Sequence, residues 1–123
     1  MIEGYQRFRE NGWTRERERW AELAEGQSPK VMVLACSDSR VDPSIIFDAQ
    51  PGQMFVVRNV ANLAPPFETS KGYHGVSAAL EFAVTQLGVE EVVVVTGSGR
   101  LLASAAQDVT RLVPELPAGW DAV

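Results

Sequence analysis

The sequence predicts an α/β fold, in which a short parallel sheet is flanked by helices. Three short apolar runs suit buried strands: Val31–Ala35, Met54–Val57 and Val92–Val95. Continuous apolar runs of this length are typical of strands that are covered on both faces, as in parallel sheets. Between the second and third runs, apolar residues recur every three or four positions, which indicates a helix. Strands that alternate with helices predict a parallel sheet.

The size, composition and charge of the chain indicate which broad class of protein it belongs to. Its 123 residues, of which 46% are hydrophobic and 22% charged, suit one small globular domain. The net charge of −5 argues against a nucleic-acid-binding surface, and no apolar run is long enough to span a membrane. A single cysteine permits no internal disulfide, which suits a reducing compartment. We therefore expect a cytoplasmic protein that binds neither nucleic acid nor membranes.

Residues 1–25 are predicted to form an N-terminal helical arm, ahead of an α/β domain over residues 26–123. The segment is highly charged, but apolar residues recur in it at helical spacing, and Gly12 is expected to divide the helix in two. One interpretation is a solvated amphipathic helix. The other is an arm that lays its aromatic residues on a partner subunit, and Trp13 and Trp20 favour this second interpretation in so polar a segment.

The remaining elements follow from local patterns. Val41–Gly52 contains two prolines and a short apolar group, which predicts a turn and a brief helix after Asp42-Pro43. The clearest helix is Tyr73–Leu87, with Gly88 after it as a stop signal. Leu101–Val113 has a similar apolar face and predicts another helix. Three strands are few for a sheet covered on both faces, so the domain is expected to be incomplete or completed by a partner.

The motif Cys36-x-Asp38-x-Arg40 follows the first strand, at the carboxyl end where parallel sheets form ligand sites. Its spacing leaves three interpretations open. Cys36 and Asp38 can be two ligands of a zinc ion. Cys36 can be a nucleophile whose thiolate is stabilised by Arg40. The three residues can also be structural, as a buried thiol beside an Asp–Arg pair.

A second candidate site is Thr96–Arg100, TGSGR, which follows the third strand. Backbone N–H groups and an arginine after a strand suggest a phosphate-binding loop. A P-loop needs Gly-Lys-Ser/Thr at its end and a dinucleotide fingerprint needs a third glycine, and neither is present. A plain turn between a strand and a helix is therefore favoured.

Several motifs, in order, make the chain similar to the β-class carbonic anhydrases: GQSPKVMVLACSDSRV, PGQMFVVRNVANL and GYHGVSAALEFAVTQLGV. The resemblance covers about residues 1–97. It implies the family fold and the family reaction, the reversible hydration of CO2 to bicarbonate at a zinc ion, catalysed by a lyase (carbonate dehydratase). By position, Cys36 matches the first zinc ligand. Asp38 and Arg40 match a catalytic dyad, in which the arginine holds the aspartate off the metal in the active state and the aspartate binds the metal in the closed state.

The resemblance also implies an oligomer. Family members are dimers or larger, with N-terminal helices laid across the neighbour, in agreement with the second interpretation of the arm. The partner is then a second copy or an intact homologue. The resemblance places a substrate pocket at the dimer interface, lined by Gln27, Phe55, Val60 and Phe82. His74, the only histidine, matches no family ligand and is interpreted as structural or exposed.

Two of the family's zinc ligands are missing from this chain. The family has Gly-His-x-x-Cys after the third strand, where this chain has VVVVTGSGRLLAS. If Gly97 matches the family glycine, Ser98 replaces the histidine and Leu101 the cysteine. A shift by one residue places Gly97 and Arg100 there instead. A catalytic zinc needs about three protein ligands, so we expect CO2 hydration by this chain to be weak or absent.

The chain is thus expected to be a truncated family member that diverges from about residue 98, and one hypothesis is a frameshift at the zinc motif. Three functions stay open. The first is an enzyme whose metal site is completed from elsewhere, for example by an intact partner subunit. The second is a non-catalytic pseudoenzyme or interaction module. The third, a thiol enzyme based on Cys36, is the weakest.

Overall fold

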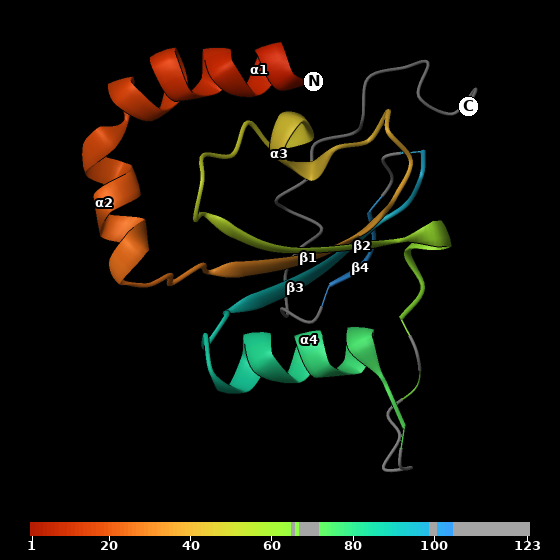
Figure 1. Ribbon diagram of the computed structural model, residues 1–123. Coiled ribbons are helices and arrows are strands. Elements are labelled where there is room, and N and C mark those ends of the chain that lie inside the picture. Colours follow the sequence, from red (N-terminus) through yellow and green to blue (C-terminus); the bar gives the residue numbers. More distant parts are fainter. Residues whose placement is uncertain (65, 67–71, 99–100, 105–123) are drawn as a thin grey trace.

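A four-stranded sheet forms the centre of the computed structural model (Figure 1). The structure describes residues 1–64, 66, 72–98 and 101–104, the last four by their backbone only. The strands are β1 (Val31–Cys36), β2 (Met54–Asn59), β3 (Glu91–Val95) and β4 (Leu101–Ser104). β1 pairs in parallel with β2 on one side and with β3 on the other. The sheet order is β2-β1-β3-β4, and the α/β class and the three parallel strands are confirmed.

The central strand β1 is the most deeply buried element. Met32, Val33, Leu34 and Ala35 are each at most 1% exposed. Successive residues of a strand point to opposite faces, so a strand that lies between two neighbours and under cover on both faces needs an unbroken apolar run. Figure 1 shows α4 (Gly75–Thr85) on one side of the sheet and the short α3 (Pro43–Ile46) toward the other.

Both of these helices were predicted, and their ends have local causes. The Asp42 carboxylate caps α3 by accepting a hydrogen bond from the Ser44 backbone N–H at 2.9 Å, and Pro43 occupies the first helical position. After α4, Gly88 has a φ of +64°, a conformation that glycine adopts at low cost. In the described part of the chain, no helix has the length and apolar character that a membrane crossing requires.

The N-terminal arm is helical, as predicted, but it does not break at Gly12. It consists of α1 (Ile2–Arg7), a π-helical segment (Phe8–Trp13) and α2 (Arg17–Glu25). Gly12 lies inside the π-helical segment, where a Cβ atom would come within 3.1 Å of the Phe8 ring. The helical conformation is interrupted at Glu16, with φ −107° and ψ 30°. Gly12 therefore makes room for an aromatic ring, and the change of direction falls four residues later.

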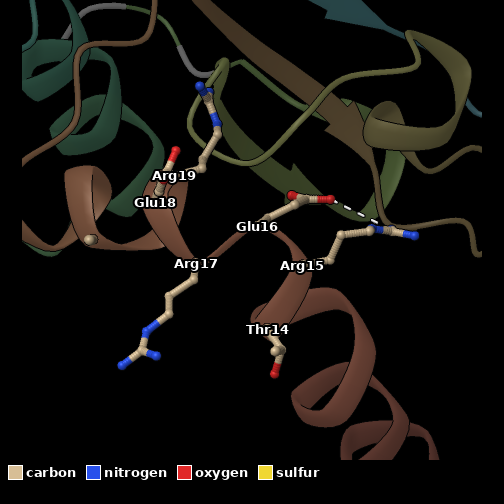
Figure 2. A pocket seen from close by; sticks show the side chains of 7 residues that line it. Thr14, Arg15, Glu16, Arg17, Glu18 and Arg19 are labelled. Atoms are coloured by element: carbon tan, nitrogen blue, oxygen red, sulfur yellow. Dashed lines mark ion pairs between the residues drawn. The ribbon is translucent and has the colours of Figure 1, made fainter.

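The arm holds its aromatic residues together and contacts the body near Pro51. Trp13 stacks on Trp20 with ring centroids 5.2 Å apart, and Phe8 meets Trp20 edge-on at 5.7 Å. Figure 2 shows the elbow between the two halves of the arm, from which Arg19 reaches the body. The Arg19 guanidinium donates two hydrogen bonds to the Pro51 carbonyl oxygen, at 2.9 and 2.6 Å.

Contact between arm and body also depends on Gly52. A Cβ atom at this position would overlap the Leu23 side chain of α2, and its φ of +84° favours glycine. The first helix of the arm stays largely uncovered, since Ile2 is 77% exposed and Tyr5 62% exposed. The arm thus touches the body through α2, while α1 leaves apolar side chains exposed.

The helix predicted over Leu101–Val113 is wrong in its first four residues, which form β4. Residues 105–113 lie outside the part that the structure describes. β4 pairs antiparallel with β3, with Val94 opposite Ala103 and an irregularity between Val94 and Val95. A short apolar run is ambiguous between helix and strand, and the free edge of β3 offers backbone groups that a following segment can pair with. The sheet is therefore mixed, and Thr96 begins a hairpin turn and not a turn into a helix.

Candidate functional site

Polar residues from three strands meet at the carboxyl end of the parallel sheet. In the ladder, Cys36 at the end of β1 is the partner of Asn59 at the end of β2, and the Ser37 N–H donates to the Asn59 carbonyl at 2.9 Å. On the other side, Gly97 follows β3 and lies against the thiol, since a Cβ atom at Gly97 would be 3.5 Å from Cys36 Sγ. The predicted position of the site, at the carboxyl end of β1, is therefore where the polar groups gather.

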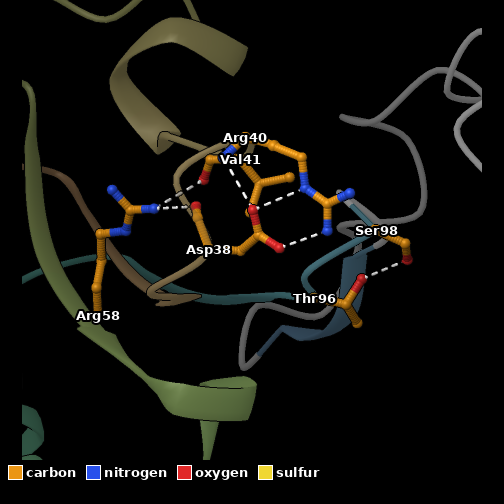
Figure 3. A network of polar contacts seen from close by, with 6 residues as sticks. All are labelled: Asp38, Arg40, Val41, Arg58, Thr96 and Ser98. Atoms are coloured by element: carbon orange, nitrogen blue, oxygen red, sulfur yellow. Dashed lines mark hydrogen bonds and ion pairs between the residues drawn. The ribbon is translucent and has the colours of Figure 1, made fainter. Parts of the chain in front are cut away.

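The predicted pair of Asp38 and Arg40 forms with bidentate geometry (Figure 3). Asp38 Oδ1 accepts hydrogen bonds from the Arg40 backbone N–H at 2.9 Å and from its Nε at 3.0 Å. Asp38 Oδ2 accepts a third from Arg40 Nη2 at 2.7 Å. These bonds, the one from the side chain above all, lower the pKa of Asp38 to about 2, and the carboxylate in turn raises the pKa of Arg40. Asp38 is thus ionised at neutral pH, and both of its oxygens are engaged.

Replacing Arg40 by alanine is expected to raise the pKa of Asp38 from about 2 toward its ordinary 3.8, because the charged hydrogen bonds that favour the carboxylate are lost. Carbon-13 NMR titration of the Asp38 carboxyl group measures this change. The folded-state pKa lies below the unfolded value, so the stabilisation by the pair is complete above about pH 4 and is lost as the pH falls toward 2. Identical titration curves for the two proteins would contradict the pairing.

Arg58, at the end of β2, is the site residue that sequence reasoning missed. Its Nε donates to the Cys36 carbonyl at 2.9 Å and its Nη2 to the Asp38 carbonyl at 2.6 Å. Its Nη1 forms an ion pair with Asp42 Oδ2 at 2.9 Å. One guanidinium therefore links the end of β1, the dyad segment and the cap of α3. Figure 3 shows its bonds to the carbonyl oxygens of Asp38 and Val41. The signal in the sequence was an arginine directly after the apolar run Met54–Val57.

The four expected pocket residues do not gather within one chain. Phe55 of β2 and Phe82 of α4 are in contact, with ring centroids 5.9 Å apart. Val60, just after β2, is 79% exposed. Gln27 precedes β1 and is also exposed. Since β1 and β2 run parallel, Gln27 and Val60 lie toward opposite ends of the sheet.

The donors at the site do not form a metal-binding set. Cys36 is a free, half-buried thiol, and both oxygens of its neighbour Asp38 bind Arg40. After β3, the Ser98 hydroxyl is 2.8 Å from the hydroxyl of Thr96. Among the residues that the structure describes, no three His, Cys, Asp or Glu side chains come together as a metal site would require. A catalytic zinc needs about three protein ligands, so these residues do not fit one.

Comparison with known proteins gives consistent matches. The sequence model of a family described as carbonic anhydrase matches residues 31–99. The carbonic anhydrase of Synechocystis sp. is 39% identical over 94 residues, which are 76% of this chain and 34% of that protein. This chain spans about a third of the length of the curated relatives it matches.

The solved structures that resemble this chain include β-carbonic anhydrases. The structure of the β-carbonic anhydrase CcaA has a TM-score of 0.67 at 41% identity, over 72% of this chain and 39% of that one. A tetrameric β-carbonic anhydrase from the ascomycete Sordaria macrospora has a TM-score of 0.68 at 29% identity, over 79% of this chain and 49% of that one. The family match includes all of β1, β2, α4 and β3.

Proposed function

Because this chain belongs to the carbonic anhydrase family, in its β class, we propose that it is a carbonic anhydrase-like protein whose own CO2 hydration is weak or absent. The observation that supports this is the donor set around Cys36. The family reaction uses a zinc-bound hydroxide, which the metal supplies at neutral pH by lowering the pKa of its bound water. In this chain the segment after β3 presents Gly97 and the Ser98 hydroxyl, and neither is a zinc ligand of the usual kind.

The polar residues at the end of β1 bind one another and hold their own segment of the chain in place. Arg40 holds both oxygens of Asp38, and Arg58 holds the segment that carries them. In the family this dyad acts next to a metal. Here we propose that it serves as a fixed structural pair that keeps the turn after β1 in place, with Cys36 as an unmetallated thiol. A free thiol also supports a cytoplasmic location, because reducing conditions preserve it.

Zinc content and CO2 hydration test this proposal together. We expect protein purified without chelators and then desalted to carry almost no zinc, and stopped-flow traces to follow the uncatalysed rate. Cys36→Ser should change neither result. About one zinc per chain, with a rate well above background that a chelator removes, would overturn the proposal and favour an enzyme whose ligands come from elsewhere, such as an intact partner subunit.

A second candidate function is that of an interaction module that pairs with another copy. Two observations favour it: Ile2 and Tyr5 of the arm are exposed, and Gln27 and Val60, expected in one pocket, lie toward opposite ends of the sheet. A pocket built from both is possible only if a second copy brings its own residue alongside, as an isologous interface does. Sedimentation velocity over a range of concentrations tests this, and a monomer at every concentration would contradict it.

A further inference from the structure

We infer that Asn59, the last residue of β2, is a positioning residue for the pairing of two copies of this chain. Its side chain holds the turn that follows β2 in a left-handed conformation, and the turn in this conformation presents Val60 to a second copy. The inference rests on the second candidate function proposed above, and it adds the residue that prepares the surface for pairing.

The Asn59 side chain closes the turn with two hydrogen bonds. Its Oδ1 accepts from the Leu63 backbone N–H at 2.6 Å, and its Nδ2 donates to the Leu63 carbonyl oxygen at 2.9 Å. Between the two residues, Val60–Asn62 form a single tight turn. The backbone of Asn59 is also held, because it is the ladder partner of Cys36 and its carbonyl accepts from the Ser37 N–H at 2.9 Å. This pair of side-chain bonds, the Asn59 clamp, thus connects the turn to the sheet.

The clamped turn contains backbone strain. Ala61 has a φ of 62° and a ψ of 22°, and Asn62 has a φ of 45°. Asparagine tolerates the left-handed region, whereas the Cβ atom of alanine makes it unfavourable. Strain of this kind persists only where the surrounding structure enforces it. The Asn59 clamp spans these two residues and is therefore the contact that can enforce their conformation.

The strain is not offset by burial of the apolar side chains of the turn. Val60 is 79% exposed and Leu63 is 65% exposed. The apolar surface continues along β2, where Val56 is 37% exposed and which is the outermost described strand on this side of the sheet. An open strand edge is a template for pairing with another chain. A strained turn that extends such an edge with exposed apolar side chains is therefore suited to contact a second copy.

The first test compares the effect of Ala61→Gly with and without the clamp, by urea denaturation of dilute protein. In the parent, glycine should raise the folding equilibrium constant about 5-fold, because a positive φ costs glycine little. In Asn59→Leu the turn is free to relax, so the same substitution should give almost no gain. Ala49→Gly is the control, since Ala49 has no positive φ and glycine there should lower the constant. Equal gains from Ala61→Gly in both backgrounds would overturn the inference.

NMR measures the conformation of the turn directly. A positive φ brings the amide and α protons of one residue close together, so the parent should show a strong NOE between these protons of Ala61. This NOE should weaken in Asn59→Leu, and its full retention would count against the clamp. If Asn59→Leu does not fold, both comparisons use Asn59→Asp, which keeps the acceptor but loses the donor to the Leu63 carbonyl. A gain from Ala61→Gly as large as in the parent would then overturn the inference.

Sedimentation velocity relates the clamp to pairing. Asn59→Leu should weaken self-association about 5- to 30-fold, because only chains with the strained turn are competent to pair. Adding Ala61→Gly should restore most of the affinity, a rescue that a merely structural role of Asn59 would not give. Val60→Ser should weaken pairing without changing the NOE of Ala61.

The outcomes separate the inference from the function on which it rests. If the parent pairs and Asn59→Leu pairs equally well, the inference is wrong and the proposed pairing stands. If the parent stays monomeric at every concentration, the proposed pairing is wrong, and the role of Val60 in it is wrong as well.

Discussion

Replacing Gly97 by cysteine is expected to produce a disulfide with Cys36 under mild oxidation. The Cβ atom that Gly97 lacks would be 3.8 Å from Cys36 Cβ, about the mean separation in disulfides. The backbone at Gly97 is outside the left-handed region that disfavours other residues. The bond would close a loop of about 60 residues, for which the chain-entropy model gives a stabilisation of about 4 kcal/mol. Denaturant unfolding of the oxidised and reduced forms measures this difference.

Two controls separate the disulfide from other effects of the substitution. Gly97→Ser adds a side chain of similar size without a second thiol, so its stability should not depend on the redox state. Gly97→Cys in a Cys36→Ser background should behave in the same way. Two thiols that both stay reactive toward a thiol reagent after oxidation would show that the end of β3 does not lie beside the end of β1.

Replacing Arg58 by methionine is expected to lower the free energy of unfolding by about 2–4 kcal/mol. Its guanidinium makes four polar contacts to groups at the end of β1 and on the segment that follows it, the one to the Val41 carbonyl being the longest at 3.5 Å. Hydrogen bonds to charged groups contribute about 1.5–3 kcal/mol each before solvent screening. The Arg58 side chain is 26% exposed, so solvent screens these hydrogen bonds. The expected loss of stability is therefore smaller than the sum of their separate contributions. Urea denaturation measures the loss.

The matched comparison uses an arginine without such contacts. Arg15 has a side chain that is 78% exposed and a single ion pair with Glu16 at 3.7 Å, so Arg15→Met should change stability by less than about 0.5 kcal/mol. Arg58→Lys should recover little, because one ammonium group cannot reach three acceptors in different directions. Equal effects of Arg58→Met and Arg15→Met would rule out the central role of Arg58.

The three parallel strands and α4 could be predicted from their apolar runs and helical spacing, although the expected burial is found in β1 and in part of β3, while β2 has no fully buried residue and α4 only Ala83. A strand with neighbours on both sides and cover on both faces, such as Val31–Cys36, leaves no position for a polar side chain. The pairing of Asp38 with Arg40 was equally accessible, since two residues of opposite charge so close in a turn can reach each other. Arg58 was missed because three of its acceptors are backbone carbonyls. Every residue has a backbone carbonyl, so such contacts cannot be recognised in the sequence.

The wrong predictions have a different physical origin. The run of leucine, alanine and serine after Arg100, LLASAA, suits a helix as well as an edge strand. The choice depends on the free edge of β3, which is a tertiary feature. Gly12 was expected to end a helix because glycine is a poor helix former. In the structure its lack of a side chain serves the packing of Phe8, and the interruption falls at Glu16.

The position of β1 in the sheet has a consequence for the order of folding. β3 and β4 are close in sequence and can pair within microseconds, as hairpins do. β1 must close much longer loops to reach β2 and β3, and the entropy cost of such closure slows the formation of parallel sheets. We therefore expect the hairpin to form before β1 takes its place between its neighbours. On this expectation, the contact of Cys36 with Gly97 forms late in folding.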